Sequence, residues 1–346
     1  MHVRGSLEDR SLYLKPRSPE YKDALSRFRF RIWMAGLDNH ISLSVLRLIV
    51  AVLTFSGNGL ILFVIFTSRR LRRSSSNLLL AQLAFAGLFL GASAATRGIS
   101  TILFNHYEIT SYARILCLVL GTPTTLGIHL SQVAILAIAI DRFICIKWPI
   151  LYRKSDNFRF AFSRFLVCTV YSLVSVGCSF IGLSFKFSDT VSVCSTGAVI
   201  TDWYSVYWLL FTSAFTVSIY AFYVLTFVLF SRQTLTSYGR SSSQKSIFVT
   251  MTVVLVSYFV LFCVPMNLFP IFKFSNVDPS ITGYVSVLAG FCSTLTGVTN
   301  IFIYGWKHPE IRGKLKSIVA GGTFTVVEHV TQGSKNSTHL PRSHHH

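Results

Sequence analysis

Charged residues are scarce in this 346-residue sequence: they make up 13% of it, and only 13 residues are Asp or Glu. Hydrophobic residues make up 51% and aromatic residues 14%, and the mean hydropathy is +0.55. Soluble domains of ordinary composition contain about 25% charged residues, so water is not the main solvent of this chain. The composition predicts an integral membrane protein.

Patterns that would indicate catalysis or cofactor binding are missing too. The sequence has no internal repeat of fixed period, no zinc-type spacing of Cys and His, and no glycine-rich phosphate loop. A membrane-embedded hydrolase needs paired carboxylates or His/Asp metal ligands within its spans, and Asp141 is the one plausible intramembrane acid. We therefore expect no enzyme activity, no cofactor and no metal site.

Seven apolar stretches are long enough to cross a bilayer, whose core takes about 20 apolar residues per helix. They cover roughly residues 42–66, 77–96, 115–140, 162–185, 204–230, 247–272 and 281–304. The connections between them are too short to form an independent soluble domain. The sequence predicts an all-α fold, in which one seven-transmembrane bundle (42–304) lies between an N-terminal arm (1–41) and a tail (305–346).

The net charge of +19 is concentrated at the ends of these stretches. The clusters are Arg69, Arg70, Arg72 and Arg73 after the first stretch, Lys147, Arg153, Lys154 and Arg159 after the third, Arg232, Arg240 and Lys245 after the fifth, and Lys307, Arg312, Lys314 and Lys316 after the seventh. This placement favours anionic membrane lipid over nucleic acid as a partner. Because positive loops stay in the cytosol, we expect a cytosolic C-terminus and an extracellular N-terminus in the plasma membrane.

The N-terminal arm argues against this orientation. Residues 1–31 are rich in Lys and Arg, which resist translocation, and no secretory signal peptide precedes the first stretch. Three explanations stay open: the topology is inverted, the arm is unusual, or the mature chain starts at Met34. The arginine cluster after the first stretch has more weight, since it follows a clear span.

An Asp-Arg pair ends the third stretch. Phe143 follows Asp141 and Arg142 directly, and Pro149 and Tyr152 come shortly afterwards. An isolated pair of this kind is usually a flanking charge cluster. The whole set, however, resembles the Asp/Glu-Arg-Tyr motif and the second-loop Pro and Tyr of rhodopsin-like G-protein-coupled receptors. By that resemblance, Asp141 restrains Arg142 until a partner binds, because an unpaired charge near hydrocarbon is costly.

Other motifs of that family occur in the same order along the chain. They are Gly57-Asn58, Asn77 with Leu83-Ala84, the set Phe259, Cys263 and Pro265, and Asn300 with Tyr304. Pro265 permits a kink in the sixth helix, and residues 306–317 are expected to form a short cytosolic amphipathic helix. The divergence from the usual pattern, with the second-loop motif kept, resembles the nematode chemosensory serpentine receptors, class SX in particular.

Two cysteines match a disulfide of the same family. Cys117 lies 25 positions before Arg142, and Cys194 lies between the fourth and fifth stretches. In most rhodopsin-like receptors these positions are joined, which the resemblance implies here on the oxidising side of the membrane. Two free thiols are the alternative. The other five cysteines read as small buried hydrophobes.

Three positions depart from the family pattern. Gly87 stands where the second helix usually has an Asp, so the buried sodium site is expected to be missing. Lys245 stands where many relatives have a Glu that pairs with the arginine, so that lock cannot form and basal activity is expected to be high. Asn300 lacks the proline that usually follows it. In the active state we expect Arg142 to lie beside Tyr304 and Tyr223.

The resemblance also implies the residues that line a ligand cavity. Thr124 replaces the Asp of amine receptors, and Thr294 replaces the retinal lysine of opsins, so neither ligand class is expected. The expected lining residues are Thr124, Thr125, Ile128, His129, Met266, Asn267, Phe291 and Thr294. This apolar, hydroxyl-rich set suits a small uncharged molecule. His129 alone fits a hydrogen-bonded core residue better than a ligand contact.

We therefore expect a chemosensory receptor that binds a small molecule within the bundle and activates a heterotrimeric G protein. The alternative is a seven-helix ligand-gated channel with the N-terminus inside, as in insect olfactory receptors. The basic N-terminal arm favours the channel. The stretch from Asp141 to Tyr152 and the paired outer cysteines favour the receptor.

Overall fold

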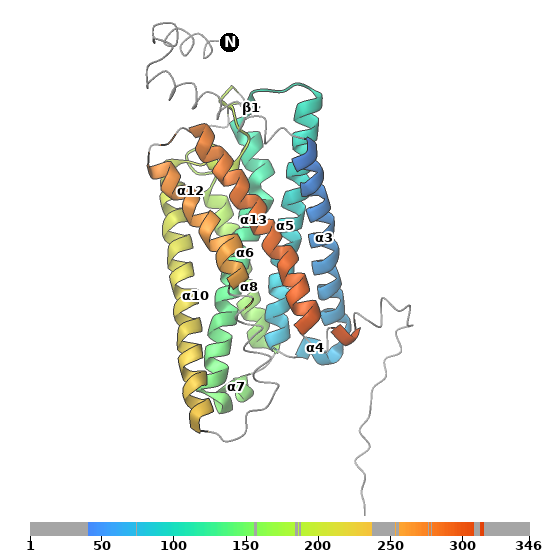
Figure 1. Cartoon of the computed structure of the whole chain (residues 1–346), viewed down its shortest axis with the longest axis vertical. Helices are drawn as coiled ribbons and strands as arrows, with labels where there is room; N and C mark the ends of the chain where they lie inside the picture. The colour runs from blue at the N-terminus through green and yellow to red at the C-terminus, as the bar shows by residue number, and fades with distance from the viewer. Residues whose placement is uncertain are drawn as a thin grey trace, which may run out of the picture.

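The computed structural model describes residues 41–73, 75–155, 158–183, 186, 188–236, 253, 256–275, 277, 279–307 and 312–314. Long helices run side by side along one axis and form a single bundle (Figure 1). In chain order the elements are α3 (Ile41–Thr67), α4 (Arg69–Arg73), α5 (Ser75–His106), β1 (Tyr112–Ala113), α6 (Arg114–Lys147), α7 (Pro149–Ser155), α8 (Phe158–Cys178), β2 (Thr190–Val191), α9 (Thr196–Val199), α10 (Asp202–Thr236), the π-helix η1 (Phe259–Cys263), α12 (Val264–Phe274) and α13 (Pro279–Lys307).

The expected all-α bundle is confirmed. Within the described residues, α3, α5, α6, α8 and α10 are long and apolar enough to span a membrane, and shorter apolar helices cover Val256–Leu268 and Tyr284–Thr299. Helices suit these segments because hydrocarbon offers the backbone no hydrogen-bond partners, so each N–H must bond within its own segment. The sixth stretch was expected to begin at residue 247, which lies outside the described part of the chain, as does most of the amphipathic helix expected at 306–317.

The faces of α3 show how the bundle is oriented towards lipid. Its buried residues include Arg47, Thr54, Asn58 and Ile61, which are spaced by seven, four and three positions and so lie on one side of the helix. Large apolar side chains such as Phe63 lie on the exposed side. The inward side of α3 therefore holds both polar and apolar groups, while its outward side exposes large apolar side chains, which suits contact with lipid.

Several helices end at residues other than the ends of the predicted apolar stretches, and α5 and α8 illustrate both directions. α5 continues to His106, ten residues beyond the expected end at 96, and it includes Arg97. The helix tolerates this arginine because a neighbouring loop supplies oxygen acceptors for its guanidinium. α8 ends at Cys178 instead of 185, and the chain then turns at Gly182, whose φ of +80° suits a residue without Cβ.

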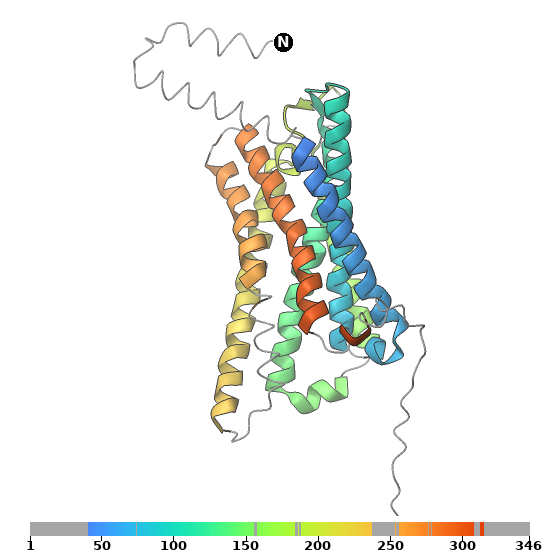
Figure 2. The same cartoon turned by 45° about the vertical axis from the view of Figure 1, so that its right-hand side comes forward.

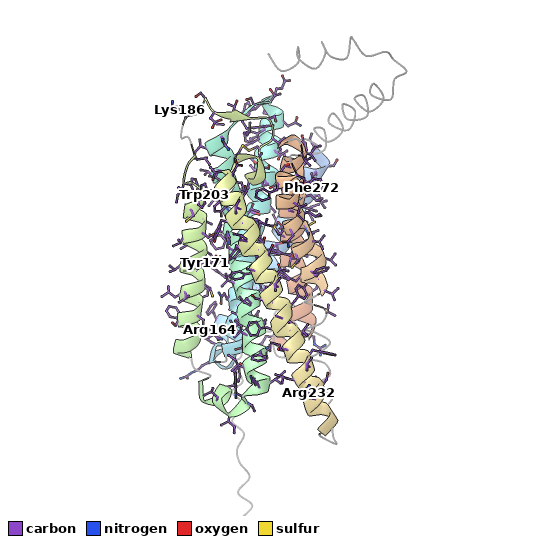
Figure 3. The ribbon with its side chains drawn as sticks, turned by 90° about the vertical axis from the view of Figure 1, so that its left-hand side faces the viewer. Arg164, Tyr171, Lys186, Trp203, Arg232 and Phe272 are labelled. Carbon is purple, nitrogen blue, oxygen red and sulfur yellow. A yellow bond between two sulfur atoms is a disulfide. The ribbon has the colours of Figure 1, made fainter. Side chains whose placement is uncertain are left out.

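The two ends of the bundle differ. The short helices α4 and α7 lie at one end, which we call the α7 end, and the β1–β2 pair lies at the other, which we call the hairpin end (Figure 2). In the pairing of β1 with β2, Tyr112 faces Val191. Figure 3 shows Lys186 near the hairpin end and Arg232 near the α7 end of α10. Between them, α6 packs against α5, α8 and α10 and contributes many buried residues to the core.

Candidate functional site

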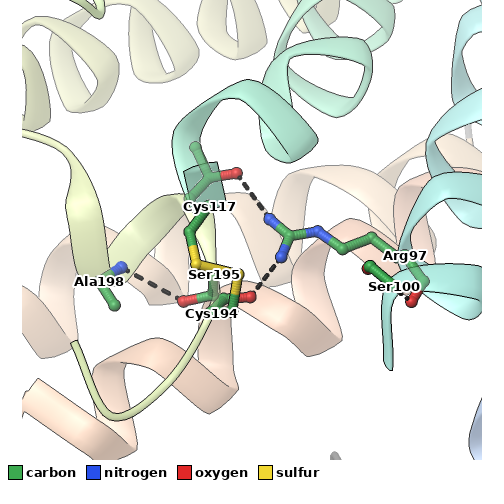
Figure 4. The surroundings of a disulfide bond; sticks show 7 residues. Arg97, Ser100, Cys117, Cys194, Ser195 and Ala198 are labelled. Atoms are coloured by element: carbon green, nitrogen blue, oxygen red, sulfur yellow. Dashed lines mark hydrogen bonds between the residues drawn. A yellow bond between two sulfur atoms is a disulfide. The ribbon is translucent and has the colours of Figure 1, made fainter. Parts of the chain in front are cut away.

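A disulfide fixes the hairpin end over the bundle. Cys117 near the start of α6 is bonded to Cys194 in the loop that leads to α9 (Figure 4), the pair that the family resemblance implied. Arg97 of α5 donates to the backbone carbonyl of Cys194 and, at 3.3 Å, to the hydroxyl of Thr196. Ser195 caps α9 by accepting from the N–H of Ala198 at 3.2 Å. We call residues 194–200 the outer lid.

The outer lid is seated by contacts with three helices. The N–H of Gly197 donates to the Ser286 hydroxyl of α13 at 3.0 Å, and Arg114 of α6 donates to the carbonyl of Val199 at 2.9 Å. On α6, a Cβ added at Gly121 would collide with the Thr196 hydroxyl. Glycine at 121 therefore permits the close approach of lid and helix, which a larger residue would prevent.

A cavity of about 60 Å³ lies beneath the outer lid. Six of the eight residues that the resemblance placed around a ligand line it: Thr124, Thr125, Ile128, Met266, Phe291 and Thr294. The lid contributes Ser195, Thr196, Gly197 and Ile200, and Trp208 of α10 adds an aromatic wall. An apolar floor with hydroxyls at its sides is the usual form of a small-molecule site.

The other two residues of that expected set, His129 and Asn267, do not line this cavity. His129 is fully buried, and its Nε2 lies 2.8 Å from the Ser175 hydroxyl and 3.3 Å from that of Tyr204. Its ring packs against Trp208 at 5.2 Å between centroids, so His129 lies one layer behind the cavity wall. Asn267 instead joins α12 to α10 by accepting from Ser213 at 3.1 Å. His129 is thus a core residue, the interpretation that we favoured from sequence.

Two arginines that sequence analysis did not assign to the site line the cavity: Arg47 of α3 and Arg97 of α5. The same two residues also line a second, outer cavity of about 220 Å³. Arg47 is 4% exposed although it lies inside an apolar run, and that position was the available signal, because ionisable residues within spans usually serve function. The set of lining residues expected from the family resemblance lacked these two arginines, which add positive charge to the cavity.

Asp141 lies at the α7 end and is contacted there by groups that include Tyr152, Arg164 and Arg142. The Tyr152 hydroxyl donates to its carboxylate at 3.2 Å, Nη1 of Arg164 lies 3.4 Å from it, and Nε of Arg142 lies 3.9 Å from it. Asp141 is 2% exposed, so these groups offset the cost of burying its charge. Arg164 comes from α8, and the sequence motif gave no sign of it. Figure 3 shows this residue towards the α7 end of that helix.

The other motif residues take up local roles around Asp141. Pro149 is the first residue of α7, where a missing N–H costs nothing, and it starts the helix that brings Tyr152 to the carboxylate. Phe143 packs edge-on against Phe222 of α10, with 5.6 Å between ring centroids. Tyr223, also on α10, is buried in the main hydrophobic core.

The sixth span is irregular where a hinge was expected. The π-helical turn η1 ends at Cys263, and α12 follows with Pro265 near its start. A π-turn and a proline both interrupt the regular hydrogen-bond ladder, and both are common causes of kinks. Within the described residues, the sixth span therefore has two irregular points next to each other, η1 and Pro265.

Gly87 stands where the second helix of the family usually has an Asp, and the Asn58 side chain fills the space that a side chain at position 87 would need. A Cβ added at Gly87 would lie 2.6 Å from the Asn58 side chain, whose Nδ2 donates to the carbonyl of Thr54 at 2.8 Å. Lys245 lies outside the described residues, and of Asn300 and Tyr304 only the helical backbone in α13 is described.

Comparison with known proteins identifies relatives of the chain. The family described as serpentine type 7TM GPCR chemoreceptor Srsx matches residues 51–319. A Caenorhabditis elegans protein named "Putative neuropeptide Y receptor 11" is 28% identical over 118 residues, which are 34% of this chain and 28% of that protein. A human protein named "Probable G-protein coupled receptor 21" is 26% identical over 103 residues, 30% of this chain and 29% of that protein. The chain thus aligns with under a third of the length of either protein.

Proposed function

The chain belongs to the serpentine type 7TM GPCR chemoreceptor family, and on that basis we propose that it binds a small organic molecule beneath the outer lid and activates a heterotrimeric G protein at the α7 end. The family membership makes it a multi-pass membrane receptor of the G-protein-coupled class. The ligand, the coupling and the orientation are the parts that we propose.

One observation carries the proposal: α6 joins the cavity to the group of charges around Asp141. Thr124 lines the cavity, and Arg142 lies 18 positions further along the same unbroken helix, roughly 27 Å at 1.5 Å per residue. A rotation or tilt of α6 on ligand binding would therefore move Asp141 and Arg142 together relative to Arg164 of α8, and so change the ion pairs that Asp141 makes. This gives a ligand a way to favour one of two arrangements, as a receptor requires.

The G-protein site is expected where Arg142 is released. When the inner half of the sixth span moves about η1 and Pro265, a cleft opens between it and α6, and Arg142 points into that cleft beside Tyr223 and Tyr304. The C-terminal helix of a G protein suits such a groove. Lys245 would repel Arg142 instead of holding it, so we expect measurable activity without ligand and lower activity in Lys245→Glu.

We propose that the α7 end faces the cytosol, with the extracellular arm at 1–41, the receptor domain at 42–304 and the cytosolic tail at 305–346. The arginines of α4 lie at this end, in agreement with the positive-inside rule. The tail contains the glycosylation sequon Asn336-Ser337-Thr338, which would stay unmodified. A glycosidase-sensitive mass shift that is lost in Asn336→Gln would show the inverted topology of the channel alternative.

A small ligand fits better than a peptide. The inner cavity is about 60 Å³ and is covered by the disulfide-linked lid, which leaves room for only about four to six water-sized volumes of 10–15 Å³ each. The similarity to a protein named as a neuropeptide Y receptor makes peptide agonists the main competing class.

The test uses purified, ligand-free receptor in lipid nanodiscs with a heterotrimeric G protein, and it measures guanine nucleotide exchange. We expect Asp141→Asn to raise exchange, because Arg142 loses its carboxylate partner. Arg142→Ala should abolish exchange while leaving surface expression intact. Normal exchange in Arg142→Ala would refute the proposed coupling mechanism.

A further inference from the structure

We propose that the ligand of the lid-covered cavity is a small organic anion whose acidic group is bound between Arg47 and Arg97. This inference rests on the proposed function and specifies its ligand class. Arg47 and Arg97 line both the inner and the outer cavity, so these two residues lie between the two cavities. They come from different helices, α3 and α5, and both face the same space.

The surroundings of these two arginines favour a negative charge. Among the described residues that line the two cavities, none is Asp or Glu. The outer cavity adds hydroxyl groups that can donate to an anion, namely those of Thr101, Thr110, Tyr112, Ser192 and Tyr284. Guanidinium forms its strongest hydrogen bonds with carboxylate, sulfate and phosphate groups, to which it can donate two parallel N–H bonds.

Both arginines lie within membrane spans. Arg47 lies six residues into α3 and is 4% exposed, and ionisable residues within spans usually mark a functional site. Its Nη1 donates to the hydroxyl of Thr101 at 3.5 Å, so its guanidinium lies beside a residue that lines the outer cavity. Arg97 is bonded to the lid through Cys194 and Thr196. An anion at this junction would therefore contact the lid directly as well as α3 and α5.

The rest of the ligand must be short and apolar. Below the arginines, Ile128, Trp208, Met266 and Phe291 line the inner cavity. A molecule with an acidic head and a small aliphatic or aromatic body matches this gradient from charged to apolar. Carboxylate is the form that we expect, because one planar group can bridge two guanidiniums without further charge.

The test measures thermal stabilisation of the full-length receptor in lipid-free detergent. The probes are hexanoate, phenylacetate and indole-3-acetate, each with its neutral amide and the corresponding amine. We expect at least one acid to raise the melting temperature at millimolar concentration or below, while its amide and amine do not. In Arg47→Gln the acid should bind about tenfold or more weakly, and Arg47→Lys should restore part of the affinity because it keeps the charge.

Control measurements separate binding from folding. Lys186→Gln removes a positive charge near the same end of the bundle (Figure 3) from a residue that lines neither cavity, and it should leave acid binding unchanged. The melting temperature of ligand-free Arg47→Gln shows whether this variant folds. If it does not fold, Arg47→Lys and Arg97→Lys serve instead, with weakened acid binding expected in both.

Three results would overturn the inference: no stabilisation by any acid, equal stabilisation by acid and amide, or stabilisation by phosphatidylglycerol alone. The last result would assign the arginines to a lipid headgroup instead of a soluble acid. Nucleotide exchange is measured on the same preparations. If acids fail while exchange that depends on Arg142 persists, the ligand class is wrong but the proposed receptor function stands.

Discussion

Arg164 is the residue whose substitution tests the switch most directly. It lies 3.4 Å from Asp141 and competes with Arg142, which lies 3.9 Å from the same carboxylate. Removing the competitor in Arg164→Gln lets Asp141 pair more closely with Arg142. We therefore expect the restrained state to become more stable and activity without ligand to fall.

The structure sets the size of this effect. At an effective dielectric constant of about 20, unit charges 3.9 Å apart attract each other by about 4.3 kcal/mol, and charges about 2.8 Å apart by about 5.9 kcal/mol. The difference of about 1.7 kcal/mol is reduced by solvent, because the Arg142 side chain is 26% exposed. A net gain of about 1 kcal/mol corresponds to roughly fivefold in the ratio of the two states.

Nucleotide exchange by reconstituted G protein measures this ratio at fixed receptor concentration. Arg164→Gln should lower ligand-free exchange by up to about fivefold, and Arg164→Lys, which keeps the charge, should lower it less. Arg114→Gln breaks a comparable ion pair with Asp189 at the hairpin end and should not change ligand-free exchange. Higher exchange in Arg164→Gln would refute the competition and would mean that Arg164 itself restrains the inactive state.

Three further predictions concern stability. Cys194→Ser should lower the free energy of unfolding by about 2–5 kcal/mol, because the disulfide to Cys117 closes a separation of 77 residues. Replacing Cys117 and Cys194 together should lower it by no more than that. Thiol labelling that finds both sulfurs free in the unaltered surface protein would contradict this prediction. Gly87→Ala should lower the free energy of unfolding by about 1–3 kcal/mol, and with it the melting temperature, because the added Cβ overpacks against Asn58. In the control Gly59→Ala the added Cβ meets nothing within 4 Å, so the melting temperature should not fall. His129→Leu should lower the free energy of unfolding by about 1–3 kcal/mol, because Ser175 and Tyr204 each lose one hydrogen bond. It should not alter ligand affinity, since His129 is not among the residues that line the cavity; a changed affinity at an unchanged melting temperature would reverse that assignment.

The sequence alone determined the helical bundle and the position of the Asp141-Arg142 pair. Hydropathy is a property of each stretch of chain, so the spans can be located without knowing their neighbours. Asp141, Arg142, Pro149 and Tyr152 lie within 12 residues, and helix geometry fixes most of their relations to one another. The pairing of Cys117 with Cys194 was available only through resemblance to a family, because spacing does not choose among seven cysteines.

Only the tertiary structure decided which side chains meet across helices. A hydropathy window averages over a span and does not show which face of a helix points inwards. In the sequence, Arg47 is therefore only one residue of an apolar run, and its burial is visible only in the packing of α3 against α5. Arg164 lies 23 positions from Asp141 and reaches it from another helix. His129 was expected among the ligand contacts by resemblance to the family, but its ring packs against Trp208 of α10 and it is not among the residues that line the cavity. These relations depend on the rotation of each helix about its axis, which is set by packing among all the helices and not by any one segment.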